Sequence, residues 1–495
     1  MKKIIFLFSF LIFWSCDKKD DELSIAKKRA IENDTNYEIK DFIWKKMNAY
    51  YLWQANIENL ADDRFEYSID NTNATSANYV YFLKQFLSPK DLFKSLLYKN
   101  NDIYGDRFSF ITDDYKSLEN SFQGVSASTG LNFNLKLIRT NNRVVGIVNY
   151  VTPNSDAERK GVKRGDIFMK IDNVFLTPFN YQNLIYSKNQ ELTFSFYRMT
   201  YSGLEFSKNI TIKQQEIHQN PIFIHKTIQR QGKKIGYLMY NSFITNYDDE
   251  LNQVFLEFKN AGIDELILDL RYNSGGYVTS ATRLASMISG VSSKNVFIQQ
   301  QVNPKLEKLW GNTLLSYFTE RTNTSPIHTL NFARANKKLY VITSNRTASA
   351  SELIINNLKP YMNIVQIGDK TVGKNLASVT IYDSPSGNKE NINKNHTWAM
   401  QPIVIRSANA NGFGDYQAGI SPDYQLEEDD SNMGVLGELS DPLLAKTIEV
   451  ITGERLRTNI TSRKAIQSVN FDYLDNSESH SPLYNRMFID IPETK

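Results

Sequence analysis

The most restrictive feature of this sequence is an alternation of short apolar segments with helix-like segments. Residues 235–240, 265–270 and 339–343 have the length and apolar content of buried strands. Helical patterns follow at residues 279–289 and 349–358. A sheet whose strands alternate with helices buries its faces beneath those helices, which produces a layered structure. The alternation therefore predicts a mixed α/β core in the second half of the chain.

The segment before this core, residues 31–115, is predicted to be a small and mostly helical domain. Apolar residues recur at helix-like intervals in residues 41–53 and 79–87. Asp34 and Asp41 are suitable residues to begin helices. We attribute the many aromatic side chains here to a core rather than to a ligand site.

A third unit is predicted at residues 120–215. A Gly/Ser loop leads into an alternating strand, and a short helix at residues 155–160 ends at Gly161. Gly165-Asp166 then turns into an apolar strand at residues 167–171. This order resembles the signature of bacterial PDZ domains.

The resemblance to PDZ domains implies a peptide-binding function for this unit. Such domains add an extended peptide to a sheet edge and hold its terminal carboxylate with backbone N–H groups. The strand from Leu131 would accept the peptide. The alternative is a structural domain that binds no peptide. The residues of the implied carboxylate-binding loop and strand start are Ser128, Thr129, Gly130, Leu131, Asn132 and Phe133.

The only cysteine, Cys16, lies directly after two lysines and an apolar run at residues 4–14. The run is too short to span a bilayer of about 30 Å as a helix. We predict a signal peptide at residues 1–15. A Cys at this place resembles a bacterial lipoprotein signal, which implies acylation of Cys16 and attachment to a membrane of the cell envelope. An ordinary cleaved signal and a short uncleaved anchor are the alternatives.

A charged run follows Cys16, and residues 16–30 are interpreted as the acylated cysteine with a solvated linker. The run also resembles the acidic tag that sends some Bacteroidetes lipoproteins to the cell surface. The expected location is therefore the outer membrane, facing either the periplasm or the surface.

The charge balance limits the classes of partner. The chain has 57 basic and 54 acidic residues, a net charge of +3, which does not indicate a nucleic-acid partner. Its five histidines are scattered, and no cysteine cluster completes a zinc site. We therefore expect neither a metal nor another cofactor.

Ser349 stands where a predicted strand turns into a predicted helix. A hydroxyl at this position lies near unpaired N–H groups and the positive end of the helix dipole, which favours a developing oxyanion. Taken alone, a serine at a helix start is far more often an N-cap than a catalytic residue. Ser349 or Ser351 could form a capping box with Glu352.

Four ordered motifs extend this local pattern. They are residues 269–276 (DLRYNSGG), residues 347–352 (TASASE), Gly373-Lys374, and residues 419–423 (GISPD). Together with residues 106–110 (DRFSF), they resemble the C-terminal processing peptidases, also called tail-specific proteases. The resemblance covers roughly residues 100–455.

The resemblance implies an α+β multidomain protein: a helical N-terminal region, a PDZ domain, and a ββα serine peptidase core of the crotonase and Clp type at residues 216–455. Ser349 would be the nucleophile and Lys374 its general base. A lysine can take a proton only when neutral, so we predict that Lys374 is buried and close to Ser349 Oγ. The backbone N–H groups expected to form the oxyanion hole belong to Ala350, Gly275 and Gly276.

Many members of the family carry a Gln four residues after the lysine, whereas this chain has Ser378. A hydroxyl can still hydrogen-bond an amine, so Ser378 is a candidate for the residue that orients Lys374. The implied reaction is cleavage of polypeptides near an exposed C-terminus. The alternatives are an inactive scaffold that binds peptide C-termini and a structural lipoprotein. Residues 456–495 form a polar tail to which the sequence assigns no role.

Overall fold

The computed structural model describes residues 36–65, 77–100, 104–187, 189–200, 203–456 and 471–491. The predicted signal peptide, Cys16 and the charged linker lie outside these residues. No helix among the described ranges is long and apolar enough to cross a membrane.

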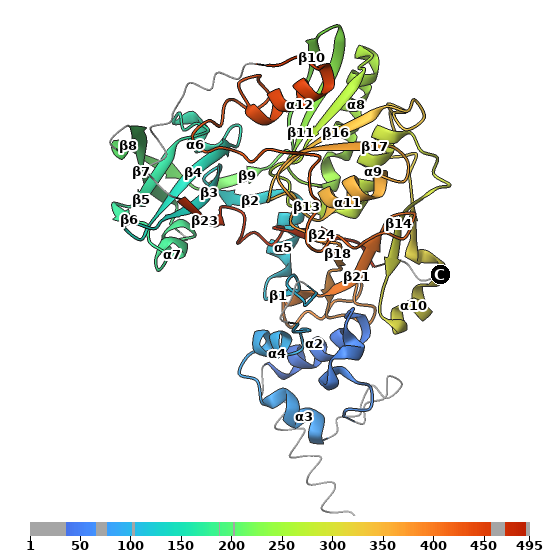
Figure 1. Ribbon diagram of the computed structural model, residues 1–495. Coiled ribbons are helices and arrows are strands. Elements are labelled where there is room, and N and C mark those ends of the chain that lie inside the picture. Colours follow the sequence, from blue (N-terminus) through green and yellow to red (C-terminus); the bar gives the residue numbers. More distant parts are fainter. Residues whose placement is uncertain are drawn as a thin grey trace, which may run out of the picture.

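The N-terminal helical region lies at one end of the molecule (Figure 1). Its largest helix buries the face that carries Ile43, Trp44 and Met47. A later helix has Ser88 as its N-cap and Pro89 in its first turn, where the missing proline N–H removes no hydrogen bond. The helices are α2 (Tyr37–Tyr50), α3 (Ala77–Lys84) and α4 (Pro89–Ser95), with 3₁₀ helices η1 (Gln54–Asn56) and η2 (Glu58–Leu60).

A second unit, here called the sheet domain, is built on a seven-stranded sheet with the order β23-β3-β4-β5-β7-β8, in which β6 pairs with β5. Phe133, Phe168 and Phe194 pack edge-to-face in its core. A two-stranded ribbon of β2 (Val125–Ser128) and β9 (Gln215–His218) joins this domain to the rest. Its other elements are β3 (Leu131–Ile138), β4 (Arg143–Val151), α6 (Asp156–Arg159), β5 (Ile167–Ile171), β6 (Val174–Phe175), α7 (Tyr181–Ile185), β7 (Glu191–Thr200), β8 (Gly203–Lys213) and β23 (Phe471–Asn476).

The predicted α/β core contains a six-stranded sheet with the order β10-β11-β12-β16-β17-β22. Only β10 and β11 pair antiparallel; the other neighbours are parallel. Helices α8, α9 and α11 contribute to the cluster on one face of the sheet, and α12 covers the other face. The bounds are β10 (Ile222–Arg230), β11 (Lys233–Tyr240), η3 (Thr245–Tyr247), α8 (Asp248–Ala261), β12 (Glu265–Asp269), α9 (Val278–Ser289), β16 (Lys338–Thr343), α11 (Ala350–Leu358), β17 (Asn363–Gly368), β22 (Tyr424–Gln425) and α12 (Pro442–Thr452).

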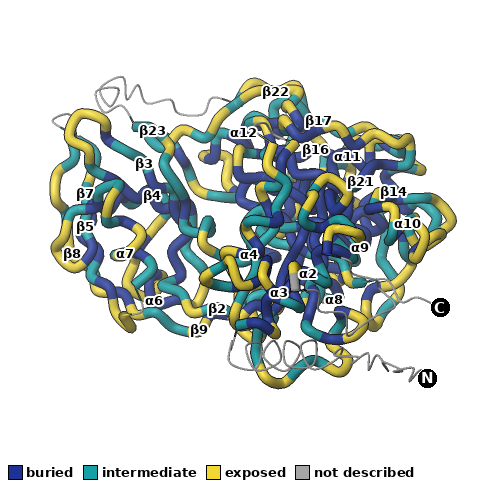
Figure 2. The backbone as a smooth tube through the Cα atoms, turned by 90° about the horizontal axis from the view of Figure 1, so that it is seen from below, coloured by how far each residue is buried: buried dark blue, intermediate teal, exposed yellow. Residues whose placement is uncertain are grey.

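A second six-stranded sheet, with the order β13-β24-β18-β21-β14-β15, packs beside the first, and a small sheet joins β1, β20 and β19. Figure 2 shows that buried residues concentrate around β16, α11 and β21. The remaining elements are β1 (Phe110–Thr112), α5 (Tyr115–Phe122), β13 (Gly275–Tyr277), β14 (Val296–Gln301), α10 (Pro304–Trp310), η4 (Gly311–Leu314), β15 (Leu315–Tyr317), β18 (Leu376–Ser378), β19 (Ile381–Tyr382), β20 (Ala399–Gln401), β21 (Ile403–Ala408) and β24 (Arg486–Phe488).

The polar tail forms two strands in different parts of the molecule. β23 is the edge strand of the sheet domain and pairs with β3, whereas β24 lies between β13 and β18 in the second sheet of the core. Figure 1 shows this red end of the chain running from the sheet domain into the centre of the molecule. The sequence indicated neither pairing, because the partners are far apart along the chain.

Candidate active site

Ser349 lies in the turn between β16 and α11, with backbone angles φ 65° and ψ −117°. A non-glycine residue in this region carries strain of about 1–3 kcal/mol, which the surroundings must hold in place. Thr347 helps to hold the turn, because its hydroxyl donates to the Leu270 carbonyl and accepts from the Ser344 N–H. The Ser349 side chain is buried, and its Oγ has no hydrogen-bond partner among the described residues. The turn therefore presents an unengaged hydroxyl at a helix start.

Glu352 connects Ser349 with the segment that carries Lys374. Its carboxylate is fully buried and accepts four hydrogen bonds. Oε2 receives the backbone N–H groups of Ser349, at 2.7 Å, and of Lys374, at 2.8 Å. Oε1 receives the Thr371 hydroxyl and the Gly373 N–H. One oxygen thus lies between the backbone nitrogens of the two predicted catalytic residues.

The electrostatics of Glu352 combine two opposed effects. Burial raises its pKa, whereas the four donated hydrogen bonds favour the charged carboxylate and lower the pKa. The net direction is upward. Sequence reasoning treated Glu352 as a capping residue. It does accept the Ser349 N–H, as a capping box requires, but it also binds the Lys374 segment.

Lys374 is completely buried, as the sequence analysis expected of a lysine base. Its Nζ lies 4.8 Å from the centre of the Phe108 ring and has no hydrogen-bond partner among the residues described. Burial lowers the pKa of Lys374 well below its usual value, and the nearby positive charge of Arg486 lowers it further. The environment therefore favours the neutral amine.

The expected contact between the two side chains is incomplete. Neither Ser349 Oγ nor Lys374 Nζ has a hydrogen-bond partner in the described part of the chain, so the two groups are not hydrogen-bonded to each other. Catalytic hydrogen bonds in structures without substrate are often long and tighten when substrate binds. The buried lysine agrees with the prediction, and the direct hydrogen bond is not formed in this structure.

The Gly275-Gly276 turn adjoins the nucleophile. A Cβ on Gly275 would lie 2.7 Å from Ser349 Cβ and 3.0 Å from Ser349 Oγ, so only glycine leaves room here. Asn273 fixes the turn, since its amide donates to the Tyr240 carbonyl and its side-chain oxygen accepts the Gly275 N–H at 2.9 Å.

The engaged Gly275 N–H corrects one prediction. This group is donated to Asn273 and is therefore unavailable to an oxyanion in this structure. Ala350 remains as a candidate donor, whereas Gly276, next along β13, pairs with Met487 of β24 in this structure. Ala350 is the first residue of α11, and N–H groups in the first turn of a helix have no partner within that helix.

Ser378 does not occupy the expected place beside the lysine. Its hydroxyl donates to the Met487 carbonyl at 3.4 Å, and its own carbonyl accepts the Ile489 N–H. Ser378 lies in β18, beside β24, and its hydroxyl contacts the backbone of β24 rather than Lys374. The prediction that Ser378 orients Lys374 is therefore wrong for this structure.

Asp106 and Phe108 belong to the DRFSF motif, to which the sequence alone assigned no role. Asp106 accepts hydrogen bonds from the N–H groups of Phe108 and Ser109 and from the Tyr51 hydroxyl. It thereby holds Phe108 in place under Lys374. The negative charge of Asp106 opposes the lowering of the pKa of Lys374.

Arg486 is a site residue that sequence reasoning missed. Its guanidinium stacks on Phe110 and donates to the Phe108 carbonyl. Burial lowers the pKa of Arg486 to about 10. Its place in a polar tail, far from every motif, gave no signal of this role.

The predicted peptide-binding loop, Ser128 to Phe133, joins the ribbon strand β2 to β3 in the sheet domain. The Ser128 hydroxyl accepts the Gly130 N–H, and the Gly130 carbonyl accepts the Thr152 N–H. A Cβ on Gly130 would collide with Ser155. The end of the loop carries Asn132 and Phe133, both buried.

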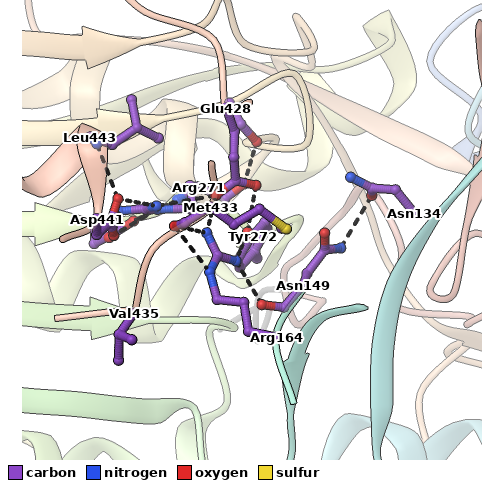
Figure 3. A network of polar contacts seen from close by, with 12 residues as sticks. Asn134, Asn149, Arg164, Arg271, Tyr272, Glu428, Met433, Val435, Asp441 and Leu443 are labelled. Carbon is purple, nitrogen blue, oxygen red and sulfur yellow. Dashed lines mark hydrogen bonds and ion pairs between the residues drawn. The ribbon is translucent and has the colours of Figure 1, made fainter. Parts of the chain in front are cut away.

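A polar network fixes the sheet domain against the core (Figure 3). Arg164 of the sheet domain donates to the Tyr272 hydroxyl and the Asn149 carbonyl and pairs with Glu428 at 2.6 Å. Arg271, from the DLRYNSGG motif, is buried and pairs with Asp269 at 2.7 Å; it also pairs with Asp441 and Glu428. The network therefore supports the Asn273–Gly276 turn from behind.

No group of three or more His, Cys, Asp or Glu side chains in the described part of the chain is arranged to hold a metal ion.

Comparison with known proteins identifies the family. The model described as "Peptidase family S41" matches residues 234–425, and that of the "Peptidase S41 N-terminal domain" matches residues 38–110. These segments contain the α/β core with Ser349 and Lys374 and the N-terminal helices. The chain belongs to peptidase family S41.

Curated relatives cover different parts of the chain. A carboxyl-terminal-processing protease of Picosynechococcus sp. is 21% identical over 355 residues, which are 70% of this chain and 76% of that protein. A CtpA-like serine protease of Staphylococcus aureus is 27% identical over 234 residues, or 46% of this chain. The match spans only 41% of the length of that relative.

A crystal structure described as an S41 protease from Bacteroides fragilis shares the fold. Its TM-score is 0.61 at 23% sequence identity, with 83% of this chain and 97% of that chain covered. The mixed α/β multidomain architecture predicted from the sequence is thus confirmed at the level of the fold.

Proposed function

We propose that this protein is a serine endopeptidase that cleaves polypeptides near their C-terminus, with Ser349 as nucleophile and Lys374 as general base. One observation carries the proposal. A strained, buried serine and a buried lysine with a lowered pKa both have unengaged side chains, and one Glu352 oxygen holds the backbones of both. An amine that is neutral near physiological pH can accept the proton of a serine hydroxyl.

The reaction follows from these groups. Substrate binding brings Ser349 Oγ and Lys374 Nζ together; Oγ attacks the peptide carbonyl carbon while its proton passes to the amine. The Ala350 N–H donates to the oxyanion, and the Gly276 N–H is the second donor once it is released from its pairing with β24. Lys374 then gives the proton to the leaving nitrogen, and an acyl ester remains on Ser349. Water, deprotonated by Lys374, attacks the ester; the acid product leaves, and the proton returns to Ser349 Oγ.

Two further parts of the proposal concern recognition and location. The sheet domain acts as a PDZ-type module for substrate tails, supported by its Gly130 loop and by β3, whose outer side pairs with an added strand, β23, in this structure. Acylation of Cys16 holds the enzyme on the outer membrane, facing the periplasm or the surface. Mass spectrometry of the intact protein extracted from membranes tests whether Cys16 is acylated.

A second candidate function is that of a catalytically inactive scaffold that binds peptides. The observation that favours it is the missing hydrogen bond between Ser349 and Lys374, together with the turn of Ser378 toward Met487. The formation of an acyl-enzyme at Ser349 distinguishes the two functions.

The proposed activity is tested by digesting a mixture of unfolded polypeptides with the protein from residue 23 onward and identifying new termini by mass spectrometry. We expect Ser349→Ala and Lys374→Ala to reduce cleavage by at least about 10³-fold. Ser351→Ala is the matched control, because the Ser351 hydroxyl is donated to the Asn273 carbonyl. Cleavage that persists in Ser349→Ala and disappears in Ser351→Ala would reassign the nucleophile.

The pH dependence of kcat/KM gives an independent test. Lys374 must be neutral to act as base, so activity is present above its folded-state pKa and is lost as pH falls through that value. Because this pKa lies well below the ordinary value, we expect the rate to reach its plateau well below pH 10.5. A rate that rises only near the ordinary lysine pKa would contradict the assignment.

A further inference from the structure

The strand β23 occupies the edge of the sheet domain where an added peptide would bind. It pairs antiparallel with β3, with Asn476 opposite Asn134, and runs toward the Ser128–Phe133 loop. Ser477 continues the pairing, since its N–H donates to the Phe133 carbonyl and its hydroxyl accepts the Phe133 N–H. Addition of a strand to a sheet edge is the usual mode of peptide binding to such domains.

The opposite side of β23 meets helix α7 and the residue that follows it. The Tyr181 hydroxyl donates to the Asp475 carboxylate at 2.9 Å, and the Tyr186 hydroxyl donates to the Asn476 carbonyl at 3.0 Å. The strand therefore lies in a groove between β3 and α7, with backbone pairing on one side and side-chain contacts on the other.

Glu478 follows and places its carboxylate at the end of this groove. Asn132 donates to its Oε1 at 2.7 Å, and the guanidinium of Arg346 lies 3.1 Å from its Oε2. Asn132 and Arg346 are both buried. The Arg346 guanidinium also donates to the side-chain oxygen of Asn134, and Arg346 lies three residues before Ser349 in the chain. Asn132 and Arg346 thus form a binding site for a carboxylate. The short segment from Arg346 to Ser349 connects this site to the turn that carries the proposed nucleophile.

β24 then brings the same segment beside the nucleophile. It pairs parallel with β13, with Arg486 opposite Gly275. A Cβ on Gly275 would collide with the Arg486 carbonyl oxygen on one side and with Ser349 on the other. The backbone of β24 therefore lies against the edge of the turn that carries the oxyanion-hole candidate Gly276.

Two cavities lie along the path of the segment. One of about 520 Å³ is lined by the peptide-binding loop, by Ser274 and by residues 477, 478 and 480–484. Another of about 370 Å³ lies past β24 and is lined by Phe122, Tyr277 and residues 489–491. The segment thus runs from one cavity to the other past the turn that carries Gly275, as a polypeptide in a continuous track would.

We propose that residues 471–491 are an intramolecular ligand that fills the polypeptide-binding track, with the Asn132–Arg346 pair as a receptor for an acidic group of the bound chain. The part of this inference that concerns displacement by a substrate rests on the proposed peptidase function. A polypeptide substrate must displace the segment, and an acidic residue or terminal carboxylate takes the place of Glu478. Because a tethered ligand has an effective concentration in the millimolar range, the segment weakens the apparent affinity of a competing peptide.

The first test measures binding of a fluorescein-labelled synthetic peptide with the sequence of residues 471–491. The full chain carries Ser349→Ala, so that no cleavage occurs. Adding Glu478→Lys places a cation beside Arg346 and releases the segment, and we expect at least ~10-fold tighter peptide binding. Glu257→Lys, on an exposed face of α8, is the matched control and leaves the affinity unchanged. A peptide with Gln at the Glu478 position should bind at least ~10-fold more weakly.

The second test is hydrogen exchange of the full Ser349→Ala chain with and without saturating peptide. The peptide carries ¹³C, so that its fragments differ in mass from those of the protein. Displacement predicts faster exchange in residues 471–478 and 486–488 and unchanged exchange in β8.

Three outcomes decide the inference. It is overturned if the peptide binds without changing exchange in the segment, or if no peptide binds to either the parent or the Glu478→Lys chain. A third outcome separates the inference from the peptidase function. If binding and exchange respond as expected but the Glu478→Lys chain with native Ser349 cleaves no polypeptide, the inference stands and the peptidase function fails.

Discussion

At the scale of single residues, the site depends on one carboxylate. Glu352 accepts from the backbone of Ser349, from the backbone of Lys374, and from Thr371 and Gly373. Each of the four donors would be buried and unpaired without it, and an unsatisfied buried donor costs about 1–3 kcal/mol. The position of both proposed catalytic residues therefore follows from a side chain that performs no proton transfer itself.

Replacing Glu352 tests this role. Gln has the same shape but presents an NH₂ group to donors that need an acceptor, so we expect Glu352→Gln to lower the free energy of unfolding by about 2–4 kcal/mol. Proteolytic activity should fall with it. Urea denaturation measures the loss, and Glu257→Gln, on an exposed face, serves as the control. Unchanged stability in Glu352→Gln would show that the carboxylate is dispensable.

Residue-scale prediction from the sequence was most specific where a motif fixed both the residue type and its spacing. Ser349 and Lys374 were named in this way, and the structure places their backbones on one oxygen atom. Ser378 was misplaced, because its orientation depends on β24, a strand from the far end of the chain. The engagement of the Gly275 N–H by Asn273 likewise depends on a turn geometry that spacing does not reveal.

At the scale of elements, the short strand β13 is packed so closely that there is almost no room for side chains on its glycines. Gly275 has φ +116°, and Gly276 has φ +135°, in a region that other residues rarely adopt. On Gly276, a Cβ would meet the Phe243 backbone. The close approach of β13 to both Ser349 and β24 is therefore possible only with glycine.

Gly275→Ala should disrupt the site. The methyl group would require Ser349 or β24 to move, so we expect a loss of at least about 10²-fold in kcat/KM together with reduced stability. Gly232→Ala is the control: it also has a positive φ, but no atom lies within 4 Å of the new methyl group, so only about 1–2 kcal/mol is lost. Comparable activity in the two variants would remove the steric argument.

Elements were predictable where hydrophobic periodicity was local. The strands β11, β12 and β16 and helix α11 lie close to the expected ranges. The pairing of β23 with β3 and of β24 with β13 was not predictable, because each joins segments more than 200 residues apart. Backbone pairing of this kind leaves little trace in the composition of a polar segment.

At the scale of the whole molecule, a few buried charges join the sheet domain to the core. Burial alone would raise the pKa of Glu428, but Arg164 and Arg271 attract its charge and bring the pKa to about 2. A folded-state pKa below the ordinary value means that Glu428 contributes stability above about pH 4.5, and that this contribution is lost as pH falls toward 2.

Glu428→Gln tests the charge at this interface. The shift corresponds to about 3 kcal/mol, so between pH 5 and pH 2 the unfolding free energy of the native chain should fall by about 3 kcal/mol more than that of the variant. Chemical denaturation at several pH values measures the difference. Glu427→Gln, the exposed neighbour, should keep the native pH dependence. Parallel curves for the native chain and Glu428→Gln would refute the linkage.

The single Glu352 oxygen shared by Ser349 and Lys374 has an evolutionary consequence. Glu352 Oε2 accepts the N–H groups of both loops, so a shift of one loop disturbs the hydrogen bond to the other. The positions of the nucleophile and its base therefore cannot change independently. Lineages that alter this pair must change both loops together or abandon the chemistry altogether. Descendants that lose catalysis should therefore show the break first at Glu352 or in its donors, before the serine itself is replaced.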